Sequence, residues 1–113
     1  MGQNLSRRTV IGGAAASAVV LTTTSLRAAE PVVHDVAIKS FTFEPARLQV
    51  QTGDTIRWTN HDVAPHTATA DEFSWDTEEI VNGEIGEVAV TEDMETSYFC
   101  AFHPHMKGSI EIL

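Results

Sequence analysis

The sequence predicts an all-β fold, a small Greek-key β-sandwich or barrel, that follows an N-terminal export signal. Short runs of alternating apolar and polar residues recur between residues 32 and 113, and clusters of Gly, Pro, Asn and Asp separate them. No convincing stretch has the period of a long amphipathic helix. Because 113 residues suffice for one small domain, we expect a single domain over residues 30–113.

The N-terminus, residues 1–29, has the pattern of a twin-arginine signal peptide. Arg7-Arg8 precedes a small, mildly apolar run from Val10 to Leu21, and cleavage is expected after Ala28 or Ala29. The run is shorter than the roughly 20 apolar residues of a membrane-spanning helix, although an uncleaved anchor remains the alternative. We therefore expect the mature protein in the periplasm, without stable membrane insertion.

The first half of the domain is expected to contain four strands. Val36 and Ile38 share one face of the opening segment, and Ile56 and Trp58 share one face of the fourth, as the two-residue period of a strand requires. These segments are residues 32–39, 41–43, 48–51 and 55–59, with breaks at Glu44-Pro45 and Thr52-Gly53-Asp54.

The second half is expected to alternate short strands with irregular segments. An acidic, irregular stretch at residues 71–79 contains Phe73 and Trp75, which we expect to anchor it to the core. The expected extended segments are residues 66–69, 80–81, 87–90, 96–100 and 108–113.

Acidic residues dominate the predicted mature domain. Four basic residues and all 16 acidic residues follow Ala29, so four positive charges against 16 negative ones give a net charge of −12. Such a surface repels nucleic acid and anionic lipid, so the charge disfavours both as partners and we expect no nucleic-acid partner. The charge either steers the protein toward a basic patch on a protein partner or only supplies solubility, and the sequence leaves both open.

A short C-terminal stretch carries the donor chemistry. Cys100 is the sole cysteine, His103 follows it by three residues, and Met106 follows His103 by three. A thiolate, an imidazole and a thioether form the soft, mixed set that copper prefers when it cycles between two oxidation states. A second imidazole is needed, and His66, directly after Pro65, is the best candidate. Each residue alone is usually a core or surface residue, but their joint order and spacing favour a metal site.

This stretch resembles the ligand loop of the cupredoxins, and most of all the short loop of the amicyanins. The amicyanin loop also has two residues between Cys and His and two between His and Met, whereas plastocyanins and pseudoazurins have a longer second gap. The first half of the domain is similar too, because Asn60, Pro65 and His66 match the family's spacing. Two positions depart from the amicyanin pattern: Phe102 replaces a proline and His105 replaces a phenylalanine.

The resemblance implies a metal site, its supporting residues and a contact surface. It implies one copper ion, Cu(II)/Cu(I), with His66, Cys100 and His103 as ligands and Met106 as a weak axial ligand. Asn60, as the brace of the cysteine loop, and Pro65 would support the site. The implied docking patch around His103 consists of Phe102, Pro104 and His105. Of the other histidines, His105 is the rival ligand, and His34 and His61 are expected to be exposed polar residues.

The resulting hypothesis is a periplasmic electron carrier rather than an enzyme. It would pass single electrons between redox proteins, by resemblance a c-type cytochrome or a periplasmic dehydrogenase, and it would be a monomer. The alternative is a copper-binding or delivery protein without redox cycling, which the presence of only Met94 and Met106 in the mature domain disfavours. A nitrite reductase domain would need a second set of histidines, and a structural zinc site would not use methionine.

Overall fold

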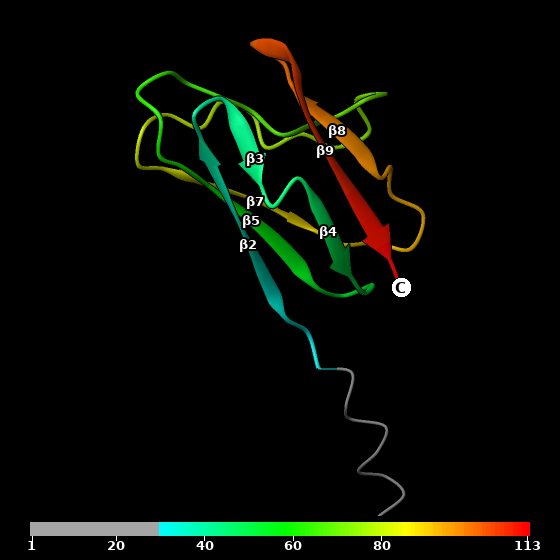
Figure 1. Ribbon diagram of the computed structural model, residues 1–113. Coiled ribbons are helices and arrows are strands. Elements are labelled where there is room, and N and C mark those ends of the chain that lie inside the picture. Colours follow the sequence, from blue (N-terminus) through cyan, green and yellow to red (C-terminus); the bar gives the residue numbers. More distant parts are fainter. Residues whose placement is uncertain (1–29) are drawn as a thin grey trace, which may run out of the picture. The chain divides into compact units, whose positions relative to one another are not determined.

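The described part of the chain, residues 30–113 of the computed structural model, consists of strands joined by turns and loops (Figure 1). The predicted signal peptide at residues 1–29 lies outside the described residues. The strands are β2 (Val33–Lys39), β3 (Thr42–Glu44), β4 (Arg47–Val50), β5 (Thr55–Asn60), β6 (Thr69–Ala70), β7 (Ile85–Ala89), β8 (Ser97–Cys100) and β9 (His103–Ile112). Over residues 30–113 no helix is long and apolar enough to cross a membrane.

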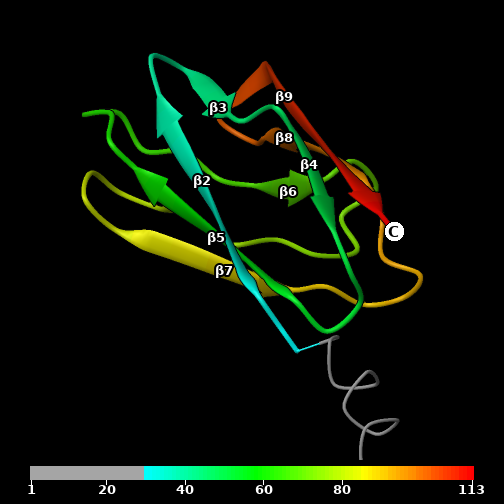
Figure 2. The same cartoon turned by 60° about the horizontal axis from the view of Figure 1, so that its bottom comes forward.

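The strands form two four-stranded sheets, which confirms the predicted all-β fold. One sheet has the order β3-β2-β5-β7 and the other the order β4-β9-β8-β6 (Figure 2). β2 pairs with β5, and β4 with β9, in parallel, whereas the other neighbours are antiparallel. Parallel pairs need crossovers, so strands distant in sequence become neighbours and their end loops meet at the same end of the molecule.

The core lies between the sheets and follows the predicted alternation. Val36, Ile38, Ile56 and Trp58 are all at most 1% exposed, while the intervening residues of β5 are only half-buried. Alternate side chains of a strand point to opposite faces, so each sheet contributes one apolar face to the core. The faces predicted for the first and fourth segments are therefore confirmed.

An aromatic cluster of Trp58, Trp75 and Tyr98 connects the two sheets. Trp58 on β5 donates its indole N–H to the hydroxyl of Tyr98 on β8, at 3.3 Å, and Trp75 stacks on Trp58 at a centroid distance of 5.8 Å. Burial raises the pKa of Tyr98 to about 12, so the phenol stays neutral at physiological pH. Gly108 of β9 lies opposite Tyr98, and a Cβ atom there would overlap the Tyr98 ring. This close approach fixes β9 against β8.

Three local expectations were wrong. Phe41 is not part of a strand, because Ser40 and Phe41 form a turn with positive φ angles of 52° and 58°. β9 begins at His103 rather than at Gly108, so the predicted loop continues directly into the last strand. Phe73 does not anchor its segment in the core: it is 70% exposed and packs edge-on against Phe99 of β8.

Candidate metal centre

Three of the four predicted ligands meet at one end of the molecule. β8 ends at Cys100, β9 begins at His103, and the loop after β5 brings in His66 (Figure 1). The Cys100 Sγ lies 3.6 Å from the Nδ1 of His66 and 3.6 Å from the Nδ1 of His103. All three donor atoms lie within 4.8 Å of one another, so a single ion can contact all of them. Cys100 and His66 are fully buried, whereas His103 is partly exposed.

Asn60 organises the loop that carries His66. Its side-chain amide donates to the carbonyl oxygens of Ala64 and Ile80 at 2.9 and 2.8 Å, and its Oδ1 accepts the N–H of Asp62 at 2.8 Å. His66 and Ile80 also exchange two backbone hydrogen bonds. These bonds place the Asn60 side chain in the loop that carries His66, and its role as a brace of the loop after Cys100 stays a prediction.

Thr67 is the residue that braces the cysteine loop. Its backbone N–H points at the Cys100 Sγ at 3.4 Å, and its hydroxyl accepts the N–H of Ala101 at 2.8 Å. One residue thus contacts both the sulfur and the peptide unit that follows it. Thr67 was not predicted from the sequence, although its position directly after a predicted ligand was an available signal.

Asp62 orients the His66 ring. The His66 Nε2 lies 2.8 Å from Asp62 Oδ2, and a carboxylate can only accept, so Nε2 carries the hydrogen. The Nδ1 then presents its lone pair toward Cys100, as a metal ligand must. Burial raises the pKa of Asp62, but hydrogen bonds from the N–H groups of Phe41 and Ser40 and from His66 outweigh it and lower that pKa overall. Asp62 was missed, although an acid four residues before a ligand histidine was a readable signal.

Phe41 covers both imidazoles. Its ring meets those of His66 and His103 edge-on, at centroid distances of 5.1 and 4.8 Å, and it is 45% exposed. The left-handed turn that holds it is stabilised by Asp62, which accepts the N–H groups of Ser40 and Phe41 at 2.8 and 3.0 Å. No sequence signal identified this residue, because its place depends on the turn conformation.

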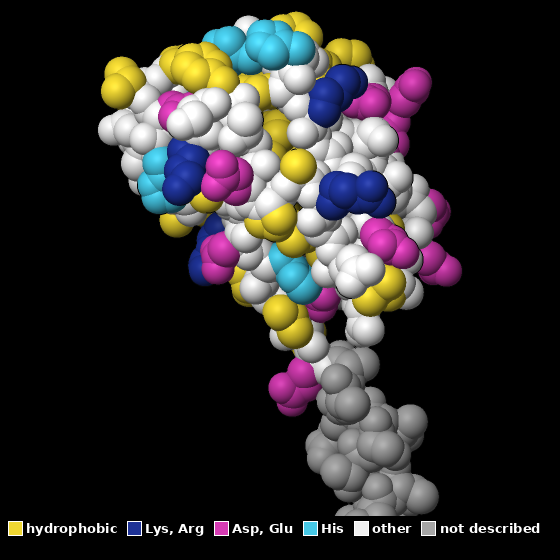
Figure 3. Space-filling model, viewed as in Figure 1, with side chains coloured by type: hydrophobic (Ala, Val, Ile, Leu, Met, Phe, Trp, Pro, Cys, Tyr) yellow, Lys and Arg dark blue, Asp and Glu magenta, His cyan; other side chains and the backbone are white. Residues whose placement is uncertain are grey.

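The remaining predicted site residues lie around this cluster. Met106 on β9 is 2% exposed and belongs to the same buried cluster as Cys100. Pro65 is exposed directly before His66. The predicted docking patch is at the surface: Phe102 is 49% exposed, and Pro104 and His105 are exposed. Figure 3 shows hydrophobic and histidine side chains gathered at the top of the view.

The cluster fits copper better than other common metals. A thiolate and two imidazole nitrogens, with the thioether of Met106 in the same buried core, are donors suited to a single ion that alternates between Cu(II) and Cu(I). The preset tautomer of His66 and the N–H aimed at the sulfur show that the protein orients the donors itself. The residues present therefore fit one copper ion.

The family comparison agrees with this geometry. Residues 12–112 match the family model described as a cupredoxin-like domain. The chain is a cupredoxin. Two solved structures of amicyanin variants superpose on this cupredoxin: a reduced proline-to-phenylalanine variant (26% identity, TM-score 0.62) and an oxidised proline-to-alanine variant (26% identity, TM-score 0.64). Each match covers 72% of this chain and 82% of the amicyanin chain.

A third solved structure belongs to an enzyme. The copper-containing nitrite reductase of Thermus scotoductus SA-01 matches with 27% identity and a TM-score of 0.66 over 74% of this chain. The match covers only 23% of the nitrite reductase chain, so this cupredoxin corresponds to one part of that enzyme.

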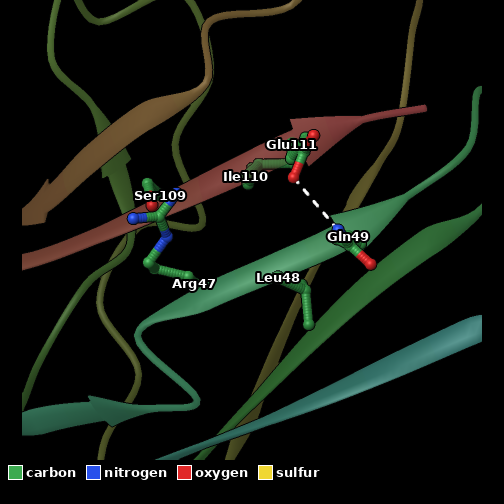
Figure 4. Close-up of a pocket in the computed structure, with 6 residues that line it drawn as sticks. All are labelled: Arg47, Leu48, Gln49, Ser109, Ile110 and Glu111. Atoms are coloured by element: carbon green, nitrogen blue, oxygen red, sulfur yellow. Dashed lines mark hydrogen bonds between the residues drawn. The ribbon is translucent and has the colours of Figure 1, made fainter.

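A shallow surface hollow on β4 and β9 contains none of the predicted ligands (Figure 4). Across it, the Gln49 side-chain amide donates to a carboxylate oxygen of Glu111 at 3.1 Å. Its lining consists of Arg47, Leu48, Gln49, Ser109, Ile110 and Glu111. These residues bring together no soft metal donors, so the proposed metal centre remains the cluster of His66, Cys100 and His103.

Among the other histidines, His61 is exposed as expected, but His34 is half-buried against Asp54.

Proposed function

We propose that this cupredoxin is a periplasmic one-electron carrier that binds a single copper ion through His66, Cys100 and His103, with Met106 as the weak axial ligand. Copper supplies the redox chemistry by accepting and releasing one electron as it alternates between Cu(II) and Cu(I). The observation that carries the proposal is the convergence of one sulfur and two imidazole nitrogens, with the His66 tautomer already set by Asp62.

The protein's part in this function is to hold the donors still. Asn60 fixes the loop of His66, Thr67 fixes the loop of Cys100, and Phe41 packs on both imidazoles. Because these contacts do not depend on the charge of the ion, the same geometry can serve both oxidation states. A site that moves little between states exchanges electrons with a small reorganisation cost.

The partly exposed His103 is the proposed point of electron entry and exit. Two exposed apolar side chains lie beside it: the ring of Phe41 packs edge-on against His103 and is 45% exposed, and the preceding residue, Phe102, is 49% exposed. An apolar patch around a redox centre suits brief docking of another redox protein. The acidic mature surface favours a partner with a basic rim. By resemblance, the partner would be a c-type cytochrome or a periplasmic dehydrogenase. The carrier would act as a monomer.

The proposed location rests on the twin-arginine pattern at residues 1–29. That export route carries folded proteins, so the copper site can form before or after transport. A lone buried cysteine is also better protected as a metal ligand than as a free thiol in an oxidising compartment.

A copper-delivery protein is the second candidate. Delivery requires ready release of the ion, whereas Cys100 and His66 are both fully buried here. Their burial therefore favours retention of the ion during redox cycling. An enzymatic role has less support, because the similarity to nitrite reductase covers a small part of that enzyme.

Voltammetry of the copper-loaded protein tests the proposal. A carrier gives a reversible one-electron wave, and the copper-to-protein ratio after many cycles equals the ratio before them. Loss of copper on reduction would support delivery instead and would contradict electron transfer.

A further inference from the structure

Two buried hydroxyl groups lie between the cysteine loop and the molecular surface. Thr67 is 4% exposed and Thr69 is 1% exposed, and they flank the buried Ala68. Burial of a hydroxyl is unfavourable unless it is hydrogen-bonded, and valine would fill the same space without that requirement. Packing alone therefore does not account for threonine at these two positions, and their hydrogen bonds must be considered.

The two hydroxyls belong to a continuous chain of hydrogen bonds. The N–H of Ala101, the residue after Cys100, donates to the Thr67 Oγ1 at 2.8 Å. The Thr67 and Thr69 Oγ1 atoms lie 2.8 Å apart, and the Thr69 Oγ1 lies 3.0 Å from Asp76 Oδ1. Asp76 is exposed, so the chain runs from the metal-binding loop through the protein interior to a surface carboxylate.

Counting hydrogens fixes the direction of this chain. A carboxylate only accepts hydrogen bonds, so Thr69 donates its single hydroxyl hydrogen to Asp76. Thr67 must then donate to Thr69, and its own oxygen receives the N–H of Ala101. Every hydroxyl accepts one bond and donates one. All bond dipoles consequently point the same way, with the negative charge at the surface end, and such chains polarise one another.

Thr67, the residue of the hydrogen-bond chain that lies next to the metal centre, also contacts the Cys100 sulfur. Thr67 uses its backbone N–H on the Cys100 Sγ while its hydroxyl holds the peptide unit after Cys100. A negative charge transmitted toward this point favours the more positive oxidation state of a bound ion. Removal of the charge should therefore favour the reduced state.

We propose that Thr67, Thr69 and Asp76 form a one-directional hydrogen-bond chain that positions the cysteine loop and couples a surface carboxylate to the redox equilibrium of the metal centre. The redox part of this proposal rests on the proposed function, whereas the positioning part does not. The three residues are positioning residues, since none of them is a predicted ligand.

Hydrogen exchange of the Ala101 amide in copper-free protein tests the positioning part. Thr67→Val removes the acceptor, so exchange at this amide should accelerate by about two- to tenfold, the equivalent of one lost hydrogen bond. Thr67→Ser keeps a hydroxyl and should restore the wild-type rate. An unchanged rate in a folded Thr67→Val protein would overturn the chain. If the valine variant fails to fold, Thr67→Ala, which also removes the hydroxyl acceptor, gives the same test.

A double-mutant cycle on the copper-loaded protein tests the redox part. Asp76→Asn should shift the Cu(II)/Cu(I) equilibrium toward Cu(I) by roughly threefold or more. Glu79→Gln is the matched control: it also removes one exposed negative charge, next to Ile80, which bonds to His66. In a Thr69→Val background, Asp76→Asn should shift the equilibrium no more than Glu79→Gln does.

The outcomes separate this proposal from the proposed function. Equal shifts by Asp76→Asn with and without Thr69, or a shift no larger than that of Glu79→Gln, would overturn the coupling while leaving the electron carrier intact. If the protein does not cycle copper at all, the proposed function fails, and the Ala101 exchange rates still decide whether the chain positions the loop.

Discussion

Two histidine–aspartate pairs lie at opposite ends of the parallel strands β2 and β5. His34 Nε2 is 2.7 Å from Asp54 Oδ2 where the two strands begin, and His66 Nε2 is 2.8 Å from Asp62 Oδ2 beyond their ends. Both aspartates also accept two backbone N–H groups. Locally, the two pairs are built alike.

They differ in what the second nitrogen of the histidine faces. The Nδ1 of His66 faces the Cys100 sulfur and shares it with His103, whereas His34 belongs to no such cluster among residues 30–113. A histidine–aspartate pair orients an imidazole, but only convergence with a sulfur and a second imidazole makes a metal centre. The pair of His34 and Asp54 has a structural role instead: it connects β2 to the turn before β5.

Substitution of the two histidines, one at a time, should give the largest difference in copper affinity between the two pairs. His66→Gln removes a proposed ligand, so copper affinity should fall by more than the roughly 10–100-fold that loss of a supporting residue costs. His34→Gln should leave copper affinity unchanged. Titration of both copper-free variants with copper, in competition with a chelator, measures the difference. Equal losses would mean that the two pairs are not functionally distinct.

Substitution of the aspartates should give a smaller difference of the same sign. Asp62→Asn removes the negative charge and replaces one of the two accepting oxygens by an NH2 donor, so it should lower copper affinity by about 10–100-fold. Asp54→Asn is the matched control, with the same change at the other pair and no expected effect on affinity. The same competition titration applies, and an unchanged affinity in Asp62→Asn would argue against its orienting role.

The pair of His34 and Asp54 should instead contribute to the pH dependence of the free energy of unfolding. The hydrogen bond with His34, then that from the Gln51 N–H, lowers the pKa of Asp54 despite its burial. A lowered pKa stabilises the fold above the unfolded value of about 3.9, and this contribution is lost as pH falls through the folded value. Copper-free wild-type protein should therefore lose urea resistance between about pH 5 and pH 2 more steeply than Asp54→Asn. Parallel curves would contradict this contribution.

The sequence predicted what depends on local pattern and residue chemistry. Strand faces such as Val36 and Ile38 follow from alternation, and the donor set follows from the spacing of Cys100, His103 and Met106. What it could not predict depends on contacts across the fold. Phe41 reaches both imidazoles only because its turn is left-handed.

Hydrogen-bond partners were the least predictable part of the site. Asn60 and Thr67 both carry groups able to brace a loop, and only the packing of β5 against Ile80 decides that Asn60 bonds there. His34 and His66 were likewise indistinguishable as single residues. Their different surroundings arise from the positions of β8 and β9, which are distant in the sequence.

The smallest effect is expected at His105, the rival ligand of the sequence analysis. It is exposed on β9, outside the cluster formed by His66, Cys100 and His103. His105→Phe should leave the blue absorption of the copper-loaded protein largely intact. A bleached His105→Phe protein would show that the ligand assignment is wrong.

The visible and electron paramagnetic resonance spectra of the Cu(II)-loaded protein, compared with those of Cys100→Ser, show whether the Cys100 sulfur binds the copper ion. We expect an intense blue absorption from the copper–thiolate bond in the wild type and its complete loss in Cys100→Ser. A colourless wild-type protein, or a blue band that survives the loss of the Cys100 sulfur, would contradict it.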